Sequence, residues 1–228
     1  MGRAWLLVIF DTVSKGCFRK MPTFDFEIPC HMPRRKLSDE LKEAISMLPS
    51  KEKDKLLFRL IVKDEALVQK LAFQLLEDTG SKEERRAELK REIEHLLNRV
   101  ATHFYSPGYL LLDLRAVSGA ITRHVKTTKD KYGEIELNFF MLNYALEMMG
   151  DEVKPFSSHR SRTFNTYVIK RAIKLQKLLG KLHEDYRLDF ESDMQALAAF
   201  LRADPQLVDM AEKLGLDVEA LENGVIPD

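Results

Sequence analysis

Apolar residues recur at intervals of three and four positions along the chain from Ser38 onward. This spacing places them on one face of an α-helix, and neither the period-two alternation of a half-buried strand nor a hairpin signal is found. The sequence therefore predicts an all-α fold, either an irregular helical bundle or a solenoid-like stack of antiparallel helices. We expect about seven main helices, followed by short C-terminal helices.

Capping residues and breaks separate the first three predicted helices. Ser38 is the expected N-cap of the first helix, Ser50 of the second and Asp64 of the third, which ends at Gly80. The first helix has an apolar face of Leu41, Ala44, Ile45 and Leu48, and the second has an apolar stripe of Leu56, Leu57, Leu60 and Ile61.

The next three predicted helices are marked by similar signals. A capping box of Ser81 and Glu84 starts the fourth helix. Ser106 precedes Pro107 at the start of the fifth, which is the most apolar helix and the expected centre of the core. The sixth helix covers residues 134–149.

Residues 150–157 form the clearest predicted linker, and residues 158–187 form a seventh helix. The apolar seam of this helix covers only two heptads, which is shorter than a coiled coil requires, so we expect it to pack into the body of the protein. The seam consists of Val168, Ala172, Leu175, Leu179, Leu182 and Tyr186.

Residues 1–31 differ from the rest in composition and lack helical periodicity. The apolar run Ala4–Phe10 is too short to span a bilayer and is followed by no clear signal-peptide cleavage site. We interpret residues 1–31 as a disordered or non-native N-terminal extension, with Met32 or Met21 as the true start. A weakly membrane-associating tail is the functional alternative.

The remaining chain is divided at the linker into residues 32–150, an N-terminal helical region, and residues 151–228, a basic helix with acidic helices that we expect to pack on the same domain. The two cysteines of the chain, Cys17 and Cys30, both precede this body. The body therefore has neither a disulfide framework nor cysteine ligands for zinc, and a cytoplasmic location is expected.

Charge is distributed unevenly along a chain that is neutral as a whole, with 36 Lys and Arg against 36 Asp and Glu. Residues 154–188 carry nine basic and two acidic side chains, and residues 189–228 carry two basic and ten acidic ones. The basic segment indicates where a partner of opposite charge docks. The acidic segment of the same chain is one candidate for that partner, because it follows directly.

Four lysines spaced four, three and four positions apart form a row along one face of the seventh helix. Such a row can bind phosphates of a nucleic acid or acidic groups of a protein, whereas a solvated helix face or internal pairing with the acidic tail would carry no function. The candidate partner-binding or phosphate-binding residues are Arg160, Arg162, Lys170, Arg171, Lys174, Lys177 and Lys181.

Searches for catalytic and metal sites give no assignment. Glu92 and His95 supply half of a di-iron motif, but a second Glu-x-x-His is missing from the chain. Neither a nucleophile elbow nor a phosphate-binding glycine loop is found, so we assign no cofactor, metal or catalytic residue. Backbone amides at the start of the seventh helix, around residues 157–161, are a possible anion site, with ordinary helix capping as the alternative.

Three functional hypotheses remain. The first is a non-enzymatic helical protein-interaction or scaffold module, including self-association, with no membrane span and no evident small-molecule substrate. The alternative is a nucleic-acid-binding protein that uses the lysine row. The third is an enzyme whose site combines dispersed residues, namely Arg115, Arg123 and His124 with Glu134 or Glu136. Contact between the acidic tail and the lysine row would make their charges structural, and separation would make the row a docking surface.

Overall fold

The computed structural model describes residues 36–77 and 81–225. All regular elements of these residues are helices, and no strand is found among them, so the all-α prediction is confirmed. Residues 1–31, which we interpret as a disordered or non-native extension, lie outside the described residues. The helices are α1 (Asp39–Met47), α2 (Ser50–Ile61), α3 (Glu65–Leu76), α4 (Ser81–Thr102), α5 (Pro107–Thr128), α6 (Lys131–Val153), α7 (Ser158–Leu179), α8 (Glu184–Arg187), α9 (Glu191–Arg202), α10 (Pro205–Lys213) and α11 (Val218–Glu222), with a 3-10 turn at Leu188–Phe190.

The chain divides into two compact units, with the boundary between Lys53 and Asp54 inside α2. The first unit contains α1, whose N-cap Ser38 accepts from the amide of Leu41 as predicted. Lys53 donates to the carbonyl of Ser46 at 2.6 Å and so joins the start of α2 to α1. The second unit contains the remaining helices.

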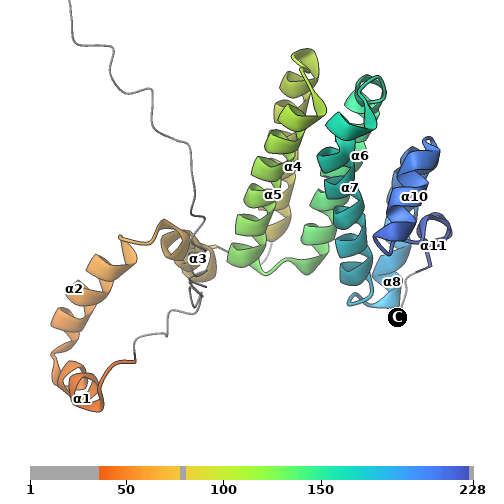
Figure 1. The fold of residues 1–228 in the computed structure, drawn as a ribbon. Helices are drawn as coiled ribbons and strands as arrows, with labels where there is room; N and C mark the ends of the chain where they lie inside the picture. Colours follow the sequence, from red (N-terminus) through yellow and green to blue (C-terminus); the bar gives the residue numbers. More distant parts are fainter. Residues whose placement is uncertain (1–35, 78–80, 226–228) are drawn as a thin grey trace, which may run out of the picture. The chain divides into compact units, whose positions relative to one another are not determined.

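Helices α4 to α7 are linked by short connections and lie side by side (Figure 1). Connections of this length between packed helices give antiparallel neighbours. α5 contacts α4, α6 and α7, and α3 packs on α5. The second unit is therefore a helical bundle, the first of the two predicted architectures.

The centre of the core is α6, not α5. α6 contacts α4, α5, α7 and α9, and it buries twelve of its 23 residues, whereas α5 buries eight of its 22. α5 is more exposed because side chains such as Tyr109 and Leu112 face away from the bundle. A high apolar content alone did not identify the helix with the most buried residues.

The structure differs from the prediction at the start of the linker and at the end of the seventh helix. α6 continues through Gly150 to Val153, because Gly150 is buried against the ring of Phe200 on α9 and a side chain there would lie 2.9 Å from that ring. α7 ends at Leu179 instead of residue 187, with Gly180 as its C-cap. The seam residues of α7 up to Leu179 are buried, as predicted, while Tyr186 beyond the helix is exposed.

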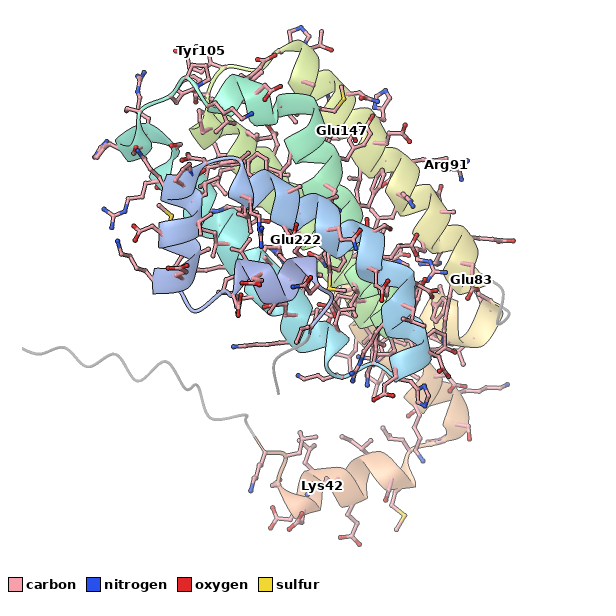
Figure 2. The ribbon with its side chains drawn as sticks, turned by 90° about the vertical axis from the view of Figure 1, so that its right-hand side faces the viewer. Lys42, Glu83, Arg91, Tyr105, Glu147 and Glu222 are labelled. Atoms are coloured by element: carbon pink, nitrogen blue, oxygen red, sulfur yellow. The ribbon has the colours of Figure 1, made fainter. Side chains whose placement is uncertain are left out.

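Charged side chains cover the outer faces of the bundle. Figure 2 shows Glu83 and Arg91 pointing outward from α4, in agreement with their exposure. Within the described ranges, no helix combines the length and the apolarity that crossing a membrane requires.

Candidate functional site

The candidate site is the charged side of α7, which the packing of the opposite side holds in place. Phe164, Val168, Ala172 and Leu175 are fully buried against the bundle. Burial of this face fixes the rotation of the helix, so the polar positions between these residues point toward solvent or toward the edges of α5 and α6.

Five predicted cations form an exposed surface that we call the cation face. All five are exposed, and none takes part in an ion pair within residues 36–77 and 81–225. Three of them follow the predicted spacing: Lys170 lies in the middle of α7, Lys177 in its last turn and Lys181 beyond its end. The cation face consists of Arg160, Arg162, Lys170, Lys177 and Lys181.

Lys174 belongs to the predicted row but is engaged inside the bundle. Its Nζ donates to Oε1 of Glu134 on α6 at 2.6 Å, and both side chains are partly shielded from solvent. The charge of Lys174 is therefore compensated within the chain, and the row does not present four equivalent free lysines.

Arg171 lies at the centre of a polar network that joins three helices. Its guanidinium donates to Ser118 Oγ on α5, to Tyr167 Oη at 3.0 Å and to Asn138 Oδ1 on α6 at 3.2 Å. Tyr167 in turn donates to the carbonyl of Leu114 at 3.3 Å. Because Ser118 and Asn138 are buried, Arg171 satisfies polar groups of the interior and belongs to the fold more than to the surface.

The acidic tail pairs with its own cations and does not cover the cation face. Glu222 contacts Arg202 at 2.6 Å, and Asp209 pairs with Lys213 one helical turn away. The helices of the tail pack chiefly on α6 and on one another, and α10 contacts α7. Thr166 Oγ1 lies 3.9 Å from Met210 Sδ in that contact, and no described ion pair joins α7 to an acidic residue of the tail.

A groove between the last three helices gathers acidic side chains of the tail. Its volume is about 560 Å³, and Arg202, Val208 and Leu216 contribute to its walls. Glu212 and Glu219 are exposed there and take part in no ion pair among the described residues. We call this the acidic groove; its acidic members are Glu212, Asp217 and Glu219.

A second polar cluster, which the sequence did not reveal, surrounds the turn between α5 and α6. Asp130 caps α6 by accepting from the amide of Gly133 at 2.8 Å. Its second oxygen lies 3.5 Å from Arg86 Nη1 and 3.9 Å from His124 Nε2, too far for a hydrogen bond to the imidazole. Arg86 also contacts Glu136 at 3.2 Å.

The electrostatics of this cluster favour a charged Asp130. Burial alone raises the pKa of Asp130, but His124, the Gly133 amide and the Arg86 guanidinium lower it by more, so the net pKa lies below the ordinary value. The side chains of His124 and Asp130 are 7% and 11% exposed. An interior carboxylate with a guanidinium partner stabilises the turn that it caps.

The dispersed residues of the enzyme hypothesis are only partly brought together. His124 and Glu136 both border the Asp130 cluster, and Glu134 pairs with Lys174. Arg115 and Arg123 are exposed on α5 and take no part in the cluster. The described residues contain no group of three or more His, Cys, Asp or Glu side chains that is arranged to hold a metal ion.

The start of α7, where an anion site was a possibility, borders a cavity of about 220 Å³ between α6, α7, α9 and α10. Ser157 is the N-cap but makes no side-chain capping bond, and Ser158 donates instead to Gln206 Oε1 on α10. Arg160 packs over the ring of Phe156 at 6.0 Å, so this cation also has a local packing role.

Comparison with known proteins yields no match: no protein-family model, no curated protein and no solved structure is similar to the chain.

Proposed function

We propose that the protein is a non-enzymatic helical interaction module that docks acidic protein surfaces on its cation face. One observation carries this proposal: among the described residues, no ion pair joins an exposed cation of α7 to an acidic residue of the tail. An uncompensated basic face on a rigid, packed helix is suited to steering and orienting a partner of opposite charge.

A second copy of the chain supplies the partner that fits this face most directly. In the acidic groove, Glu212 and Glu219 are exposed carboxylates that pair with no cation of the described chain, and they lie beside the apolar side chains of Val208 and Leu216. Docking of the cation face into this groove joins two different surfaces and is therefore a heterologous, head-to-tail contact. Such contacts weaken with salt because exposed charges are screened over about 8 Å at physiological ionic strength.

Salt-dependent mass measurement tests self-association. Multi-angle light scattering of the purified protein, at rising concentration in low salt, should show masses above the 26.4 kDa of one chain. High salt should return the mass toward that of one chain. A mass of one chain at all concentrations and both salt levels would reject self-association and leave docking to a different acidic protein.

Matched variants separate the cation face from general charge effects. Lys170→Glu together with Lys177→Glu should abolish association, because both lysines are exposed and form no ion pair with residues 36–77 or 81–225. The matched control, Lys126→Glu, reverses an exposed lysine on α5 outside the cation face and should leave the mass unchanged.

Nucleic-acid binding is the second candidate, and the same exposed lysines favour it. Lys170, Lys177 and Lys181 follow one stripe, and each neutralised phosphate of duplex DNA contributes a salt slope of about −0.9. Gel retardation of duplex DNA and of RNA in low salt tests this function, with the Lys170→Glu, Lys177→Glu variant as the control. Absence of retardation would exclude it.

The proposal also includes a cytoplasmic location and a scaffold role, in which the bundle holds partners in place without changing them chemically. Cells that contain the labelled protein can be separated into soluble and membrane fractions, and the fraction in which the label is found tests the location.

A further inference from the structure

A basic and apolar segment of α2 is a second surface feature, separate in sequence from the cation face. Residues 55–63 read KLLFRLIVK and contain six apolar residues, three cations and no acidic residue. They form the second half of α2 and the turn after it, where the amide of Val62 still donates to the carbonyl of Phe58. The segment is thus helical almost to its end.

The apolar side chains of this segment are open to solvent. α2 buries none of its residues. Leu57 is 52% exposed, Phe58 and Leu60 are each 63% exposed, and Val62 is 78% exposed. A contiguous apolar surface of this kind on a helix indicates an interaction site. Single exposed apolar side chains scattered over a protein need no partner, whereas a cluster of them does.

The three cations define the shape of this surface. Lys55, Arg59 and Lys63 are four positions apart, so they lie along one edge of the helix, and apolar residues fill the rest of its circumference over these two turns. This apolar face is wider than the stripe of about 100° that a helix presents to a protein core. A wide apolar face beside a basic edge is typical of a helix that lies in the interface of a bilayer.

The charge pattern also disfavours pairing of this segment with its copy. In a parallel pair, each cation lies beside the same cation of the other chain. In an antiparallel pair, Lys55 lies beside Lys63 and Arg59 lies beside Arg59. Both arrangements place like charges together, whereas an anionic bilayer compensates all three cations at once.

We propose that residues 55–63 bind the surface of a bilayer that contains anionic lipids. The apolar side chains enter the boundary between headgroups and acyl chains, while Lys55, Arg59 and Lys63 extend their charged ends to the anionic headgroups. This activity uses a surface other than the cation face and does not depend on the proposed docking to acidic proteins.

Co-sedimentation of the full-length protein with vesicles tests the proposal. We expect the protein to pellet with vesicles of phosphatidylcholine and phosphatidylserine, and at least tenfold less with vesicles of phosphatidylcholine alone. Phe58→Glu with Leu60→Glu should lower binding to the anionic vesicles at least tenfold. Leu112→Glu, at an exposed leucine of α5 outside the segment, is the matched control and should bind like the wild type.

A second measurement keeps the test independent of folding defects. In the conservative variant Phe58→Trp, the added indole should shift its emission to shorter wavelength on addition of anionic vesicles, relative to the wild-type protein. Lys170→Glu with Lys177→Glu should leave this shift in place, which separates the segment from the cation face.

Three outcomes would overturn the proposal. The first is absence of pelleting with anionic vesicles, and the second is equal pelleting of wild type and Phe58→Glu, Leu60→Glu. The third is that the wild-type protein forms an oligomer in the absence of vesicles and that the double variant does not. The apolar segment would then bind a second protein chain.

Discussion

Lys174 Nζ lies 2.6 Å from Glu134 Oε1, and this contact divides the predicted lysine row into one internal and three exposed members. Lys174 sits between Lys170 and Lys177 in the sequence pattern, and spacing alone makes the three equivalent. Among these three lysines, only Lys174 has its charge compensated by another helix within the described ranges. The cation face therefore consists of those predicted cations that have no ion-pair partner within the described chain.

Replacement of Lys174 should affect stability and not docking. Lys174→Ala removes a partly exposed ion pair, so the free energy of unfolding should fall by about 0–1 kcal/mol. Lys170→Ala should leave the free energy of unfolding unchanged and weaken association instead. Urea denaturation together with light scattering of both variants distinguishes the two roles, and equal effects of both substitutions on association would contradict this division.

Arg171 should be more important for stability than any residue of the cation face. Arg171→Met leaves Oδ1 of the buried Asn138 without its donor, whereas Ser118 Oγ keeps Tyr167 Oη at 2.7 Å, and an unsatisfied buried polar group costs about 1–3 kcal/mol. Urea denaturation should therefore show a clearly lower free energy of unfolding for this variant. An unchanged midpoint would mean that the network around Arg171 does not hold α5, α6 and α7 together.

Gly133 should tolerate no side chain. A Cβ there would lie 2.2 Å from Asp130 Oδ2 and 2.9 Å from Arg86 Cδ, so Gly133→Ala must displace the buried carboxylate, at a cost of about 1–3 kcal/mol. Gly119→Ala is the matched control, because the nearest atom lies 3.5 Å away on the side chain of Arg123. Alanine should stabilise that helical position by up to about 1 kcal/mol. Thermal unfolding should show opposite shifts for the two variants.

Asp130 should make stability decrease as the pH falls. The folded-state pKa of Asp130 lies below its ordinary value, so its stabilising contribution is complete above the unfolded-state pKa and is lost as the pH falls through the folded-state value. Asp130→Asn keeps a capping oxygen and removes the charge. At neutral pH the variant should be less stable than the wild type, because it loses the attraction between the carboxylate and the Arg86 guanidinium. The difference from the wild type should shrink in acid, as urea denaturation at several pH values can show.

Asp193 should show the opposite pH dependence. Burial raises the pKa of Asp193 and the charge of Glu136 adds to this, while Asn143, which donates at 3.2 Å, and Lys90 only partly offset it. The ionised form therefore costs folding free energy above the folded-state pKa, and this cost disappears as the pH falls. Asp193→Asn should raise the melting temperature at neutral pH and change it little in acid. A lower melting temperature at neutral pH would contradict this assignment.

Local signals in the sequence predicted the helices well, because caps and apolar spacing act within a few residues. Asp64 and Ser106 cap helices as expected, through bonds to residues three positions later. The predicted helix ends are wrong where a residue far away in the sequence determines whether the helix continues. Gly150 looked like the start of a linker but is buried by Phe200, fifty positions away along the chain.

The candidate site was predictable to the same extent. Exposure of Lys170 and Lys177 follows from the helical pattern of α7, because the opposite face carries the buried seam. The pairing of Lys174 with Glu134 depends on how α6 packs against α7, and no local spacing encodes it. The Arg86 and Asp130 cluster has the same origin, since its members come from α4 and from the turn before α6.

Charge exchange between the cation face and the acidic groove is the most direct test of the proposed function. Lys170→Glu with Lys177→Glu, and separately Glu212→Lys with Glu219→Lys, should each have the light-scattering mass of one chain in low salt. An equimolar mixture of the two variants should recover a mass of at least two chains, because each then presents a surface complementary to the other. A mixture that keeps the mass of one chain, or single-face variants that associate like the wild type, would contradict head-to-tail docking between these two surfaces.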